Sequence, residues 1–292
     1  MIKQIWKSGG ELIEKLLIID GHNLLFQMFF GMPSRIINKD SKAIQGTLGF
    51  VGALIKIIKM ICPTHLVVLF DGEHENDRVE LLTDYKANRT DYSQIPDEEN
   101  PFSQIADVFN ALDYMRIKHI EVSELETDDV IASYCHAYGA QMEVVISSFD
   151  SDFFQLISDN VSIFRYRGDN SVICDTVYLQ DKYEILPCQY ADFKSLIGDS
   201  SDNIKGANKV GPKTATQLIN LFGNLENILH DAELITKSSI KESIIRNTQR
   251  LRNNYKLIKL VDRAYLPFVL NELKYNYNDV TTTEVLKAIN LK

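Results

Sequence analysis

Leu16-Leu17-Ile18-Ile19-Asp20 is a short apolar run that ends in an aspartate, and the chain repeats this arrangement twice. Residues 66–70 lead into Asp71, and residues 143–148 lead to Asp150. Short apolar runs that alternate with helical patterns are typical of an α/β fold with a mostly parallel sheet. The three runs are therefore predicted to be strands, each with an aspartate at its carboxyl end.

Two helices are predicted between and after these strands. Residues 50–61 form one of them, and residues 130–138 form the other, with Thr127 as N-cap, two acids in the first turn and Gly139 at the end. In open parallel sheets, ligands bind at the carboxyl ends of the strands. The aspartates are therefore expected to share one site.

Nine acidic residues stand at places where this fold can gather them. Ionised carboxylates cannot share a small site without cations, and an all-oxygen ligand set favours Mg²⁺ or Mn²⁺. Any single acid of this kind can equally be a loop residue or a helix cap, but the whole set favours a metal-dependent site acting on phosphates. The set is Asp20, Asp71, Glu126, Asp128, Asp129, Asp150, Asp152, Asp199 and Asp202.

Composition excludes little beyond membrane and secreted classes. The 292 residues are 45% hydrophobic, enough for one large or two modest domains. The net charge of −9 falls to zero without the nine clustered acids, so it does not argue against a nucleic-acid substrate. The four cysteines form no CxxC pair, and neither a signal peptide nor a membrane span is recognisable. A soluble, cytoplasmic protein is expected.

Two segments differ from the rest in charge. Residues 73–100 hold nine acids against three basic residues, which predicts a mobile, solvated excursion from the core, either a long loop or helices that stand away from it. From about residue 186 the pattern is helical, and residues 203–225 contain lysines but no acid. A helical face of basic residues follows, which is either an ordinary solvated surface or a track for phosphates. Its members are Arg252, Lys256, Lys259 and Arg263.

Val210-Gly211-Pro212-Lys213-Thr214-Ala215 places a glycine before a helix that opens with proline. Exposed amides at such a helix start bind phosphates, and Lys213 adds positive charge. The pattern favours a helix-hairpin-helix element, which holds DNA by its backbone without reading sequence. A plain turn is the alternative.

In this order and spacing the motifs resemble those of the 5′ nuclease family, which includes the 5′→3′ exonuclease domain of bacterial DNA polymerase I and the phage and bacterial flap endonucleases. The resemblance spans residues 15–265. It rests on Ile19-Asp20-Gly21-His22-Asn23, Phe70-Asp71-Gly72, Tyr85-Lys86-Ala87-Asn88-Arg89, Glu126-Thr127-Asp128-Asp129, Asp150-Ser151-Asp152, Gly198-Asp199-Ser200-Ser201-Asp202-Asn203, and Gly206 with the glycine turn at 210–215.

The resemblance implies a PIN-like nuclease core over residues 1–185, with a helical arch at about 73–100. A helical region over residues 186–292 would hold duplex DNA through a helix-three-turn-helix element. The first metal site would be served by Asp20, Asp71, Glu126 and Asp128. The second would be served by Asp129, Asp150, Asp152, Asp199 and Asp202, with Asp129 and Asp150 near the boundary.

The resemblance also assigns residues to the substrate. Lys86 and Arg89 would reach the scissile phosphate, Arg78 is a further arginine of the arch, and Tyr85 would stack on the terminal nucleotide. DNA would be held by Lys205, Lys209, Gly211, Lys213 and Thr214, where relatives also bind K⁺. Two positions depart from the family pattern. Gln27 replaces an arginine, so that a phosphate contact is weakened or supplied elsewhere, and Lys209 replaces the middle glycine of the hairpin.

The expected activity is that of a structure-specific, divalent-metal-dependent 5′ nuclease in DNA replication and repair. It would cut 5′ flaps, nicks and primers with one or two Mg²⁺ or Mn²⁺ ions, leaving a 5′-phosphate and a 3′-hydroxyl. Its partner would be branched or nicked duplex DNA, or an RNA–DNA primer, and it would act as a monomer without a membrane.

Two other functions stay open. Residues 146–152 have the apolar-run-then-DxD form of an aspartate-nucleophile phosphatase, although that motif belongs near the N-terminus. A catalytically silent binder of branched DNA is the second, although a pure binder gains nothing from nine clustered carboxylates.

Overall fold

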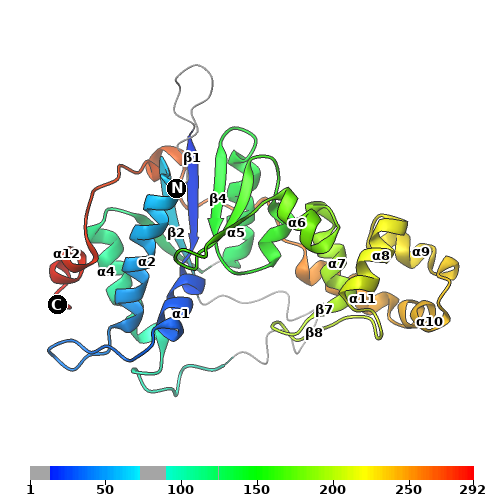
Figure 1. Ribbon diagram of the computed structural model, residues 1–292, viewed down its shortest axis with the longest axis horizontal. Helices are drawn as coiled ribbons and strands as arrows, with labels where there is room; N and C mark the ends of the chain where they lie inside the picture. Colours follow the sequence, from blue (N-terminus) through cyan, green and yellow to red (C-terminus); the bar gives the residue numbers. More distant parts are fainter. Residues whose placement is uncertain (1–13, 73–89, 124) are drawn as a thin grey trace.

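The computed structural model describes residues 14–72, 90–123 and 125–292 (Figure 1). Six strands form one sheet in the order β3-β2-β1-β4-β5-β6, parallel except for β6. They are β1 (Lys15–Asp20), β2 (His65–Asp71), β3 (Lys118–Val122), β4 (Glu143–Ser147), β5 (Val161–Arg165) and β6 (Val172–Cys174). The three predicted strands are confirmed as β1, β2 and β4. Because they are neighbours in the sheet, their aspartates emerge side by side.

Both faces of the sheet are buried. Leu17 and Ile19 of β1 pack on one face against α1 (Gly21–Gly31), α2 (Gln45–Ile61) and α4 (Ile105–Tyr114). Leu16 and Ile18 pack on the opposite face, where α5 (Thr127–Tyr138) lies. This alternation follows from the two-residue period of a strand and explains why β1 is apolar throughout.

The two predicted helices are confirmed as α2 and α5, with corrected starts. Helix α2 begins earlier than predicted, at Gln45, because the Gln104 side chain accepts a hydrogen bond from the Thr47 amide at 2.9 Å. Helix α5 ends at Gly139 as predicted, but its N-cap is Glu126, so the prediction for Thr127 is wrong by one residue. The Thr127 amide instead donates to Asp71 at 3.3 Å, which ties the helix start to the end of β2.

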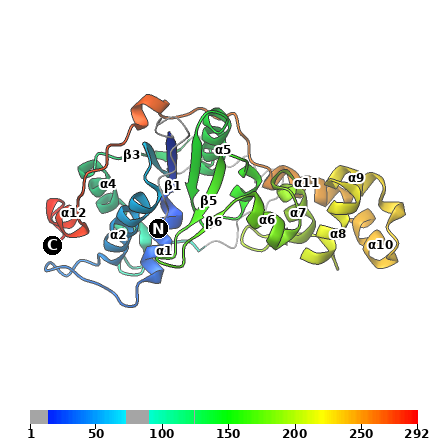
Figure 2. The same cartoon turned by 45° about the horizontal axis from the view of Figure 1, so that its top comes forward.

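A helical region extends from one side of the sheet, and Figure 2 shows α6 beside β6. Its helices are α6 (Thr176–Tyr183), α7 (Tyr190–Ile197), α8 (Pro212–Phe222), α9 (Leu225–His230), α10 (Ser238–Arg246) and α11 (Thr248–Ile258). A short hairpin of β7 (Gly198–Asp199) and β8 (Ile204–Lys205) follows α7. Gly206 directly follows this hairpin. A larger residue does not fit there, because a Cβ would lie 2.3 Å from the Ile197 carbonyl carbon.

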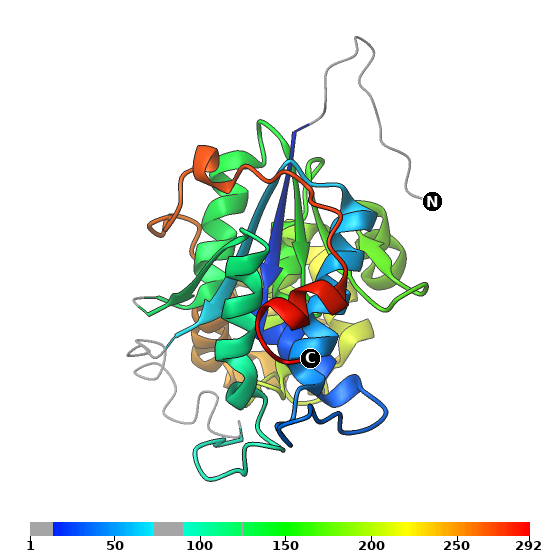
Figure 3. The ribbon, with the colours of Figure 1, turned by 90° about the vertical axis from the view of Figure 1, so that its left-hand side faces the viewer.

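After α11 the chain returns to the sheet, and α12 (Thr282–Ala288) packs beside α2 and α4 (Figure 3). The described residues also form short 3₁₀ helices, which are η1 (Pro101–Gln104), η2 (Asp152–Leu156), η3 (Pro187–Gln189), η4 (Ala232–Leu234) and η5 (Leu270–Leu273). Over the described ranges 14–72, 90–123 and 125–292, no helix has the length and apolarity needed to cross a bilayer.

The predicted basic helical face is wrong in part. Helix α11 ends at Ile258, and Lys259 has extended backbone angles, so Arg263 does not continue the face. Arg252 is in addition paired with Glu226, with Nη2 and Oε2 2.9 Å apart. The four-three-four spacing therefore does not correspond to one continuous track.

Candidate active site

The strand ends form the floor of a cavity of about 1360 Å³. Seven carboxylates line it, and five of them belong to the predicted metal-binding set. Those five are Asp20, Asp71, Glu126, Asp128 and Asp150. The cavity thus brings together acids from β1, β2, the start of α5 and the segment after β4, which lie more than a hundred residues apart in the sequence.

Asp20 is held rigidly at the centre of this group. One of its carboxylate oxygens caps α1 by accepting from the Asn23 amide at 3.1 Å, and the other accepts from Ser148 Oγ at 2.8 Å. The next residue must be glycine for a packing reason, because a Cβ on Gly21 would lie 2.5 Å from the ring of Phe70. Helix α1 can therefore start directly against β2.

The carboxylates of the cavity repel one another, and a bound cation would relieve this repulsion. Burial, together with the nearby charge of Asp71 and a smaller effect of Asp150, raises the pKa of Asp20 from 3.8 to about 7. Carboxylates that oppose one another's ionisation in this way suit a hard divalent ion, because oxygen ligands are what Mg²⁺ and Mn²⁺ prefer. The residues present therefore fit such an ion.

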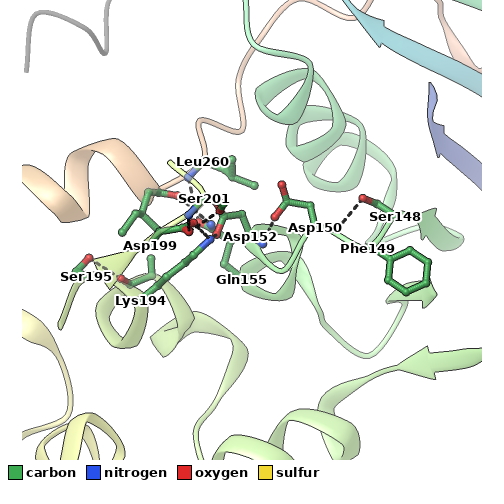
Figure 4. A network of polar contacts seen from close by, with 12 residues as sticks. Ser148, Phe149, Asp150, Asp152, Gln155, Lys194, Ser195, Asp199, Ser201 and Leu260 are labelled. Carbon is green, nitrogen blue, oxygen red and sulfur yellow. Dashed lines mark hydrogen bonds and ion pairs between the residues drawn. The ribbon is translucent and has the colours of Figure 1, made fainter. Parts of the chain in front are cut away.

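Asp150 connects this group to a second one. Its amide donates to Ser148 Oγ at 3.0 Å, and its carboxylate accepts from the Asp152 amide at 2.8 Å (Figure 4). Beyond it, carboxylate oxygens of Asp152, Asp199 and Asp202 lie within 4.8 Å of one another. The β7–β8 hairpin contributes the last two of these acids, so its tight turn sets the geometry of the outer group.

Lys194 of α7 lies within the outer group, and the sequence analysis missed it. Its ammonium contacts both Asp152 and Asp199, and the side chain is buried (Figure 4). Burial would lower the pKa of Lys194, but Asp152, Asp150 and Asp199 raise it above its usual range, so the lysine is charged. Burial likewise opposes ionisation of Asp199, yet Lys194 and Ser201 lower its pKa. Its two acidic partners lie on other elements, so the sequence around Lys194 does not point to them.

Asp129 is placed differently from the other predicted ligands. Its Oδ1 accepts from the Val261 amide at 2.8 Å, and Asp129 neither lines the cavity nor belongs to the outer group. The side chain thereby links α5 to the chain after α11. A part for Asp129 in metal binding stays a prediction.

Aromatic side chains form one wall of the cavity, and sequence analysis missed them as well. The rings of Phe26, Tyr92 and Phe102 contact one another, with centroids 5.2–5.5 Å apart and edge-to-face geometry. Tyr92 belongs to the acidic segment that was predicted to be solvated over its whole length. Most of its described part, residues 90–100, is exposed loop as predicted, and Tyr92, which packs into this wall, is the exception.

The glycine turn has the predicted form. Gly211 is the N-cap of α8 and Pro212 is its first residue, and no side chain caps this helix start. The side chains of Lys205, Lys209 and Lys213 are exposed. Lys209 has a φ of 65°, so it adopts the left-handed conformation that glycine favours at the position where the family pattern has glycine.

The remaining predicted site residues are placed as follows. Gln27 lines the cavity, and its Nε2 donates to the carbonyl oxygen of Tyr166 at 2.7 Å. Thr214 lies in the first turn of α8. Arg78, Tyr85, Lys86 and Arg89 lie outside the described residues.

Acids gathered at the carboxyl end of a parallel sheet, in a chain that also presents an uncapped helix start at α8, are typical of a metal-dependent enzyme that acts on nucleic-acid phosphates. Comparison with known sequences agrees. The family profile "5′-3′ exonuclease, N-terminal resolvase-like domain" matches residues 15–184, and its "C-terminal SAM fold" partner matches residues 185–281. The chain belongs to the 5′-3′ exonuclease family, as its motifs predict, and is a metal-dependent 5′ nuclease.

Relatives of two lengths are found. A 5′-3′ exonuclease of Buchnera aphidicola is 33% identical over 280 residues, which cover 95% of this chain and 91% of that protein. The thermostable DNA polymerase I of Thermus thermophilus is 31% identical over 254 residues, covering 87% of this chain but 29% of the polymerase. The chain thus spans less than a third of its polymerase relatives.

Solved structures share the fold. The T5 D15 protein co-crystallised with metal ions superposes with a TM-score of 0.72 at 23% identity, covering 94% of this chain and all of that one. A T5 D15 flap endonuclease complex with DNA and metal ions gives 0.68 at 23% identity, covering 95% and 100%. The predicted mostly parallel sheet with an attached helical region is confirmed.

Proposed function

We propose that this 5′ nuclease cuts the phosphodiester backbone of branched or nicked duplex DNA, close to a 5′ flap, a 5′ end or an RNA–DNA primer. The observation that carries the proposal is the joint lining of one cavity by five acids from four separate segments of the chain. The cavity would admit a nucleic-acid strand. The exposed helix start of α8 would contact a backbone phosphate of the same substrate. Neither rival function needs both features.

The acids that line the cavity would hold one Mg²⁺ or Mn²⁺ ion, and the group of Asp152, Asp199 and Asp202 would hold a second. When bound, such ions supply a Lewis acid and lower the pKa of a coordinated water. Asp20 and Asp150 fix the geometry, because each is held by Ser148 and by a backbone amide. Lys86 and Arg89 are proposed to neutralise the scissile phosphate, with Arg78 and Tyr85 assisting.

Duplex DNA would be held away from the cut by the glycine turn. The amides of Lys213 and Thr214 open α8 without a side-chain cap, and an added Cβ on Gly211 would meet nothing within 4 Å, so a phosphate has room to approach the backbone. Lys205 and Lys209 add charge, and K⁺ binding at this turn remains part of the proposal. The aromatic wall offers unpaired bases a stacking surface. One monomer provides all these parts.

A 5′-labelled flap duplex in Mg²⁺ tests this function. We expect labelled oligonucleotides that end near the flap junction, and no cleavage after addition of EDTA. A fully single-stranded control should be cut more slowly. Release of inorganic phosphate alone would favour the phosphatase alternative, and binding without cleavage would favour the silent binder.

A further inference from the structure

Among the described residues, the lining of the active-site cavity carries little positive charge. Its described lining contains seven carboxylates and a single lysine or arginine, Arg167. A substrate strand brings further negative charge into this space, so a cation at the lining has a strong electrostatic effect on binding. Arg167 comes from the turn after β5, on the side of the cavity that Gln27 also lines.

The backbone that carries Arg167 is fixed by hydrogen bonds within a tight turn. The Arg167 amide donates to Ser171 Oγ at 2.9 Å, and Ser171 Oγ donates to the Gly168 carbonyl at 2.6 Å. Gly168 has a φ of 58°, which lets the chain reverse directly after the arginine. The side chain therefore projects from a defined point.

Phe149 provides a shelf for the guanidinium of Arg167, which lies 5.0 Å from the ring centroid. The shelf is anchored on both sides, because the Phe149 amide donates to Asn23 at 3.0 Å and its carbonyl accepts from Arg165 at 3.0 Å. A guanidinium stacked on a ring keeps its N–H edge available for a phosphate. Phe149, Asp150 and Arg167 line the same cavity, so the guanidinium shares this space with the metal-binding acids.

Arg165 and Arg167, at the end of β5, make different contacts. Arg165 is partly buried, bonds Phe149 and lies 4.5 Å from the ring centroid of Phe154. Arg167 is exposed and makes no ion pair within the parts of the chain that the structure describes. Arg165 therefore supports the shelf, whereas Arg167 is available to a ligand.

Gln27 is part of the same arrangement. Its bond to the Tyr166 carbonyl holds the residue that immediately precedes Arg167. A glutamine at position 27 thus positions the turn, and the arginine that the described cavity wall offers beside it is Arg167.

We propose that Arg167 binds a phosphate of the cleaved strand beside the metal-binding acids and supplies the contact that Gln27 cannot make. This proposal rests on the proposed function, because it needs a nucleic-acid strand in the cavity. The role is electrostatic and geometric, and no bond is made or broken by Arg167.

Binding of a fluorescent 5′-flap duplex in EDTA, measured over a range of salt concentrations, tests the proposal without cleavage. Arg167→Gln should bind roughly tenfold more weakly at low salt, as loss of a charged hydrogen bond does, and its salt slope should be flatter by about one contact. Arg167→Lys should retain the slope and lose part of the affinity. The matched control is Arg116→Gln, which removes an exposed charge before β3, at the opposite edge of the sheet.

A compensating variant makes the test specific. Gln27→Arg in the Arg167→Gln background should recover the salt slope, because a guanidinium again faces the cavity. Equal losses on 5′-phosphorylated and 5′-hydroxyl flaps would identify an internal phosphodiester, and a loss confined to the phosphorylated flap would identify the terminal phosphate. Wild-type slope and affinity in Arg167→Gln would overturn the proposal while flap cleavage by the wild type stands. A wild type that neither binds nor cuts flaps would overturn both.

Discussion

Lys194 decides the charge balance of the outer acid group. One ammonium is shared by Asp152 and Asp199, and both carboxylates are largely removed from solvent. A divalent ion that binds these acids must therefore compete with a cation that the protein itself supplies. Removing one member of a buried ion pair leaves an uncompensated charge, which is strongly destabilising.

Replacement of this lysine gives a first prediction. We expect Lys194→Met to lower the free energy of unfolding by about 3–5 kcal/mol in EDTA, because two buried carboxylates lose their cation. Added Mg²⁺ or Mn²⁺ should restore more stability in the variant than in the wild type. Urea unfolding with and without metal measures both effects, and Lys182→Met, on the exposed part of α6, is the control. Equal metal effects in Lys194→Met and wild type would contradict competition.

Asp20 gives a prediction about pH. The folded protein keeps a proton on Asp20 up to about pH 7, whereas the unfolded chain releases it near 3.8. Because the folded state binds the proton more tightly, stability without metal should fall as the pH rises from about 4 to about 7. Asp20→Asn, which preserves the cap of α1, should weaken this decline and gain at most about 4 kcal/mol above pH 7.

Urea unfolding in EDTA across this pH range measures the effect of Asp20→Asn. Asp40→Asn, in the exposed loop before α2, removes a carboxylate that is not enclosed and should follow the wild-type curve. A decline in Asp20→Asn as steep as in the wild type would show that Asp20 does not titrate as described.

The residues of the site differ in how far sequence reveals them. Asp20, Asp71 and Asp150 follow apolar strands, and the carboxyl ends of parallel strands must meet, so their proximity was predictable. Lys194 and Arg167 carry no such signal, because their partners lie on other elements and are brought near by tertiary packing. Thr127 shows the same limit locally, since a contact from Asp71 replaces the cap that its neighbours suggest.

At the scale of elements, the start of α8 combines a helix start without a side-chain cap with the exposed Lys205, Lys209 and Lys213. Lys209 adopts the left-handed backbone conformation in this turn although it is not a glycine. We expect that Lys213→Ala weakens binding to flap duplexes of any sequence and flattens the salt slope by about one contact.

Fluorescence anisotropy on two flap duplexes of unrelated sequence, and on a short single strand, checks this effect of Lys213→Ala. The single strand should be bound almost as before. Lys287→Ala, on α12 at the far end of the molecule in Figure 1, is the matched control. A sequence-dependent loss, or an unchanged slope, would argue against a phosphate contact.

Helices and strands were predictable from the sequence where the spacing of apolar residues is regular. Strands β1, β2 and β4 are short apolar runs, and α5 carries its own end signal in Gly139. The basic face after residue 252 failed because charge spacing alone does not show where a helix stops, and α11 ends when Ile258 and Leu260 turn into the core.

At the scale of the whole molecule, the chain after α11 ties the helical region to the sheet. The Gln155 side chain bonds the backbone of both Ile258 and Leu260, and Tyr134 bonds both backbone groups of Phe268. Asp129 adds the bond to Val261. These side chains satisfy buried backbone groups across the boundary, so both parts should unfold together.

Tyr134→Phe tests this coupling. The change leaves the Phe268 amide and carbonyl without their partner, which should cost about 1–3 kcal/mol. Urea unfolding should still show a single transition, shifted to lower concentration, whereas Tyr138→Phe on the same helix should shift it little. Two separate transitions, of which Tyr134→Phe moves only one, would show that the parts unfold independently.

The central claim is that acids at the carboxyl ends of neighbouring strands form one metal-dependent nuclease site, with Asp150 between its two groups. Single-turnover cleavage and binding of a 5′-flap duplex by Asp150→Asn test it most directly. We predict nearly complete loss of cleavage in Mg²⁺ with binding equal to or tighter than that of the wild type, because one repulsive charge is removed from the cavity. Cleavage by Asp150→Asn at close to the wild-type rate would contradict the account.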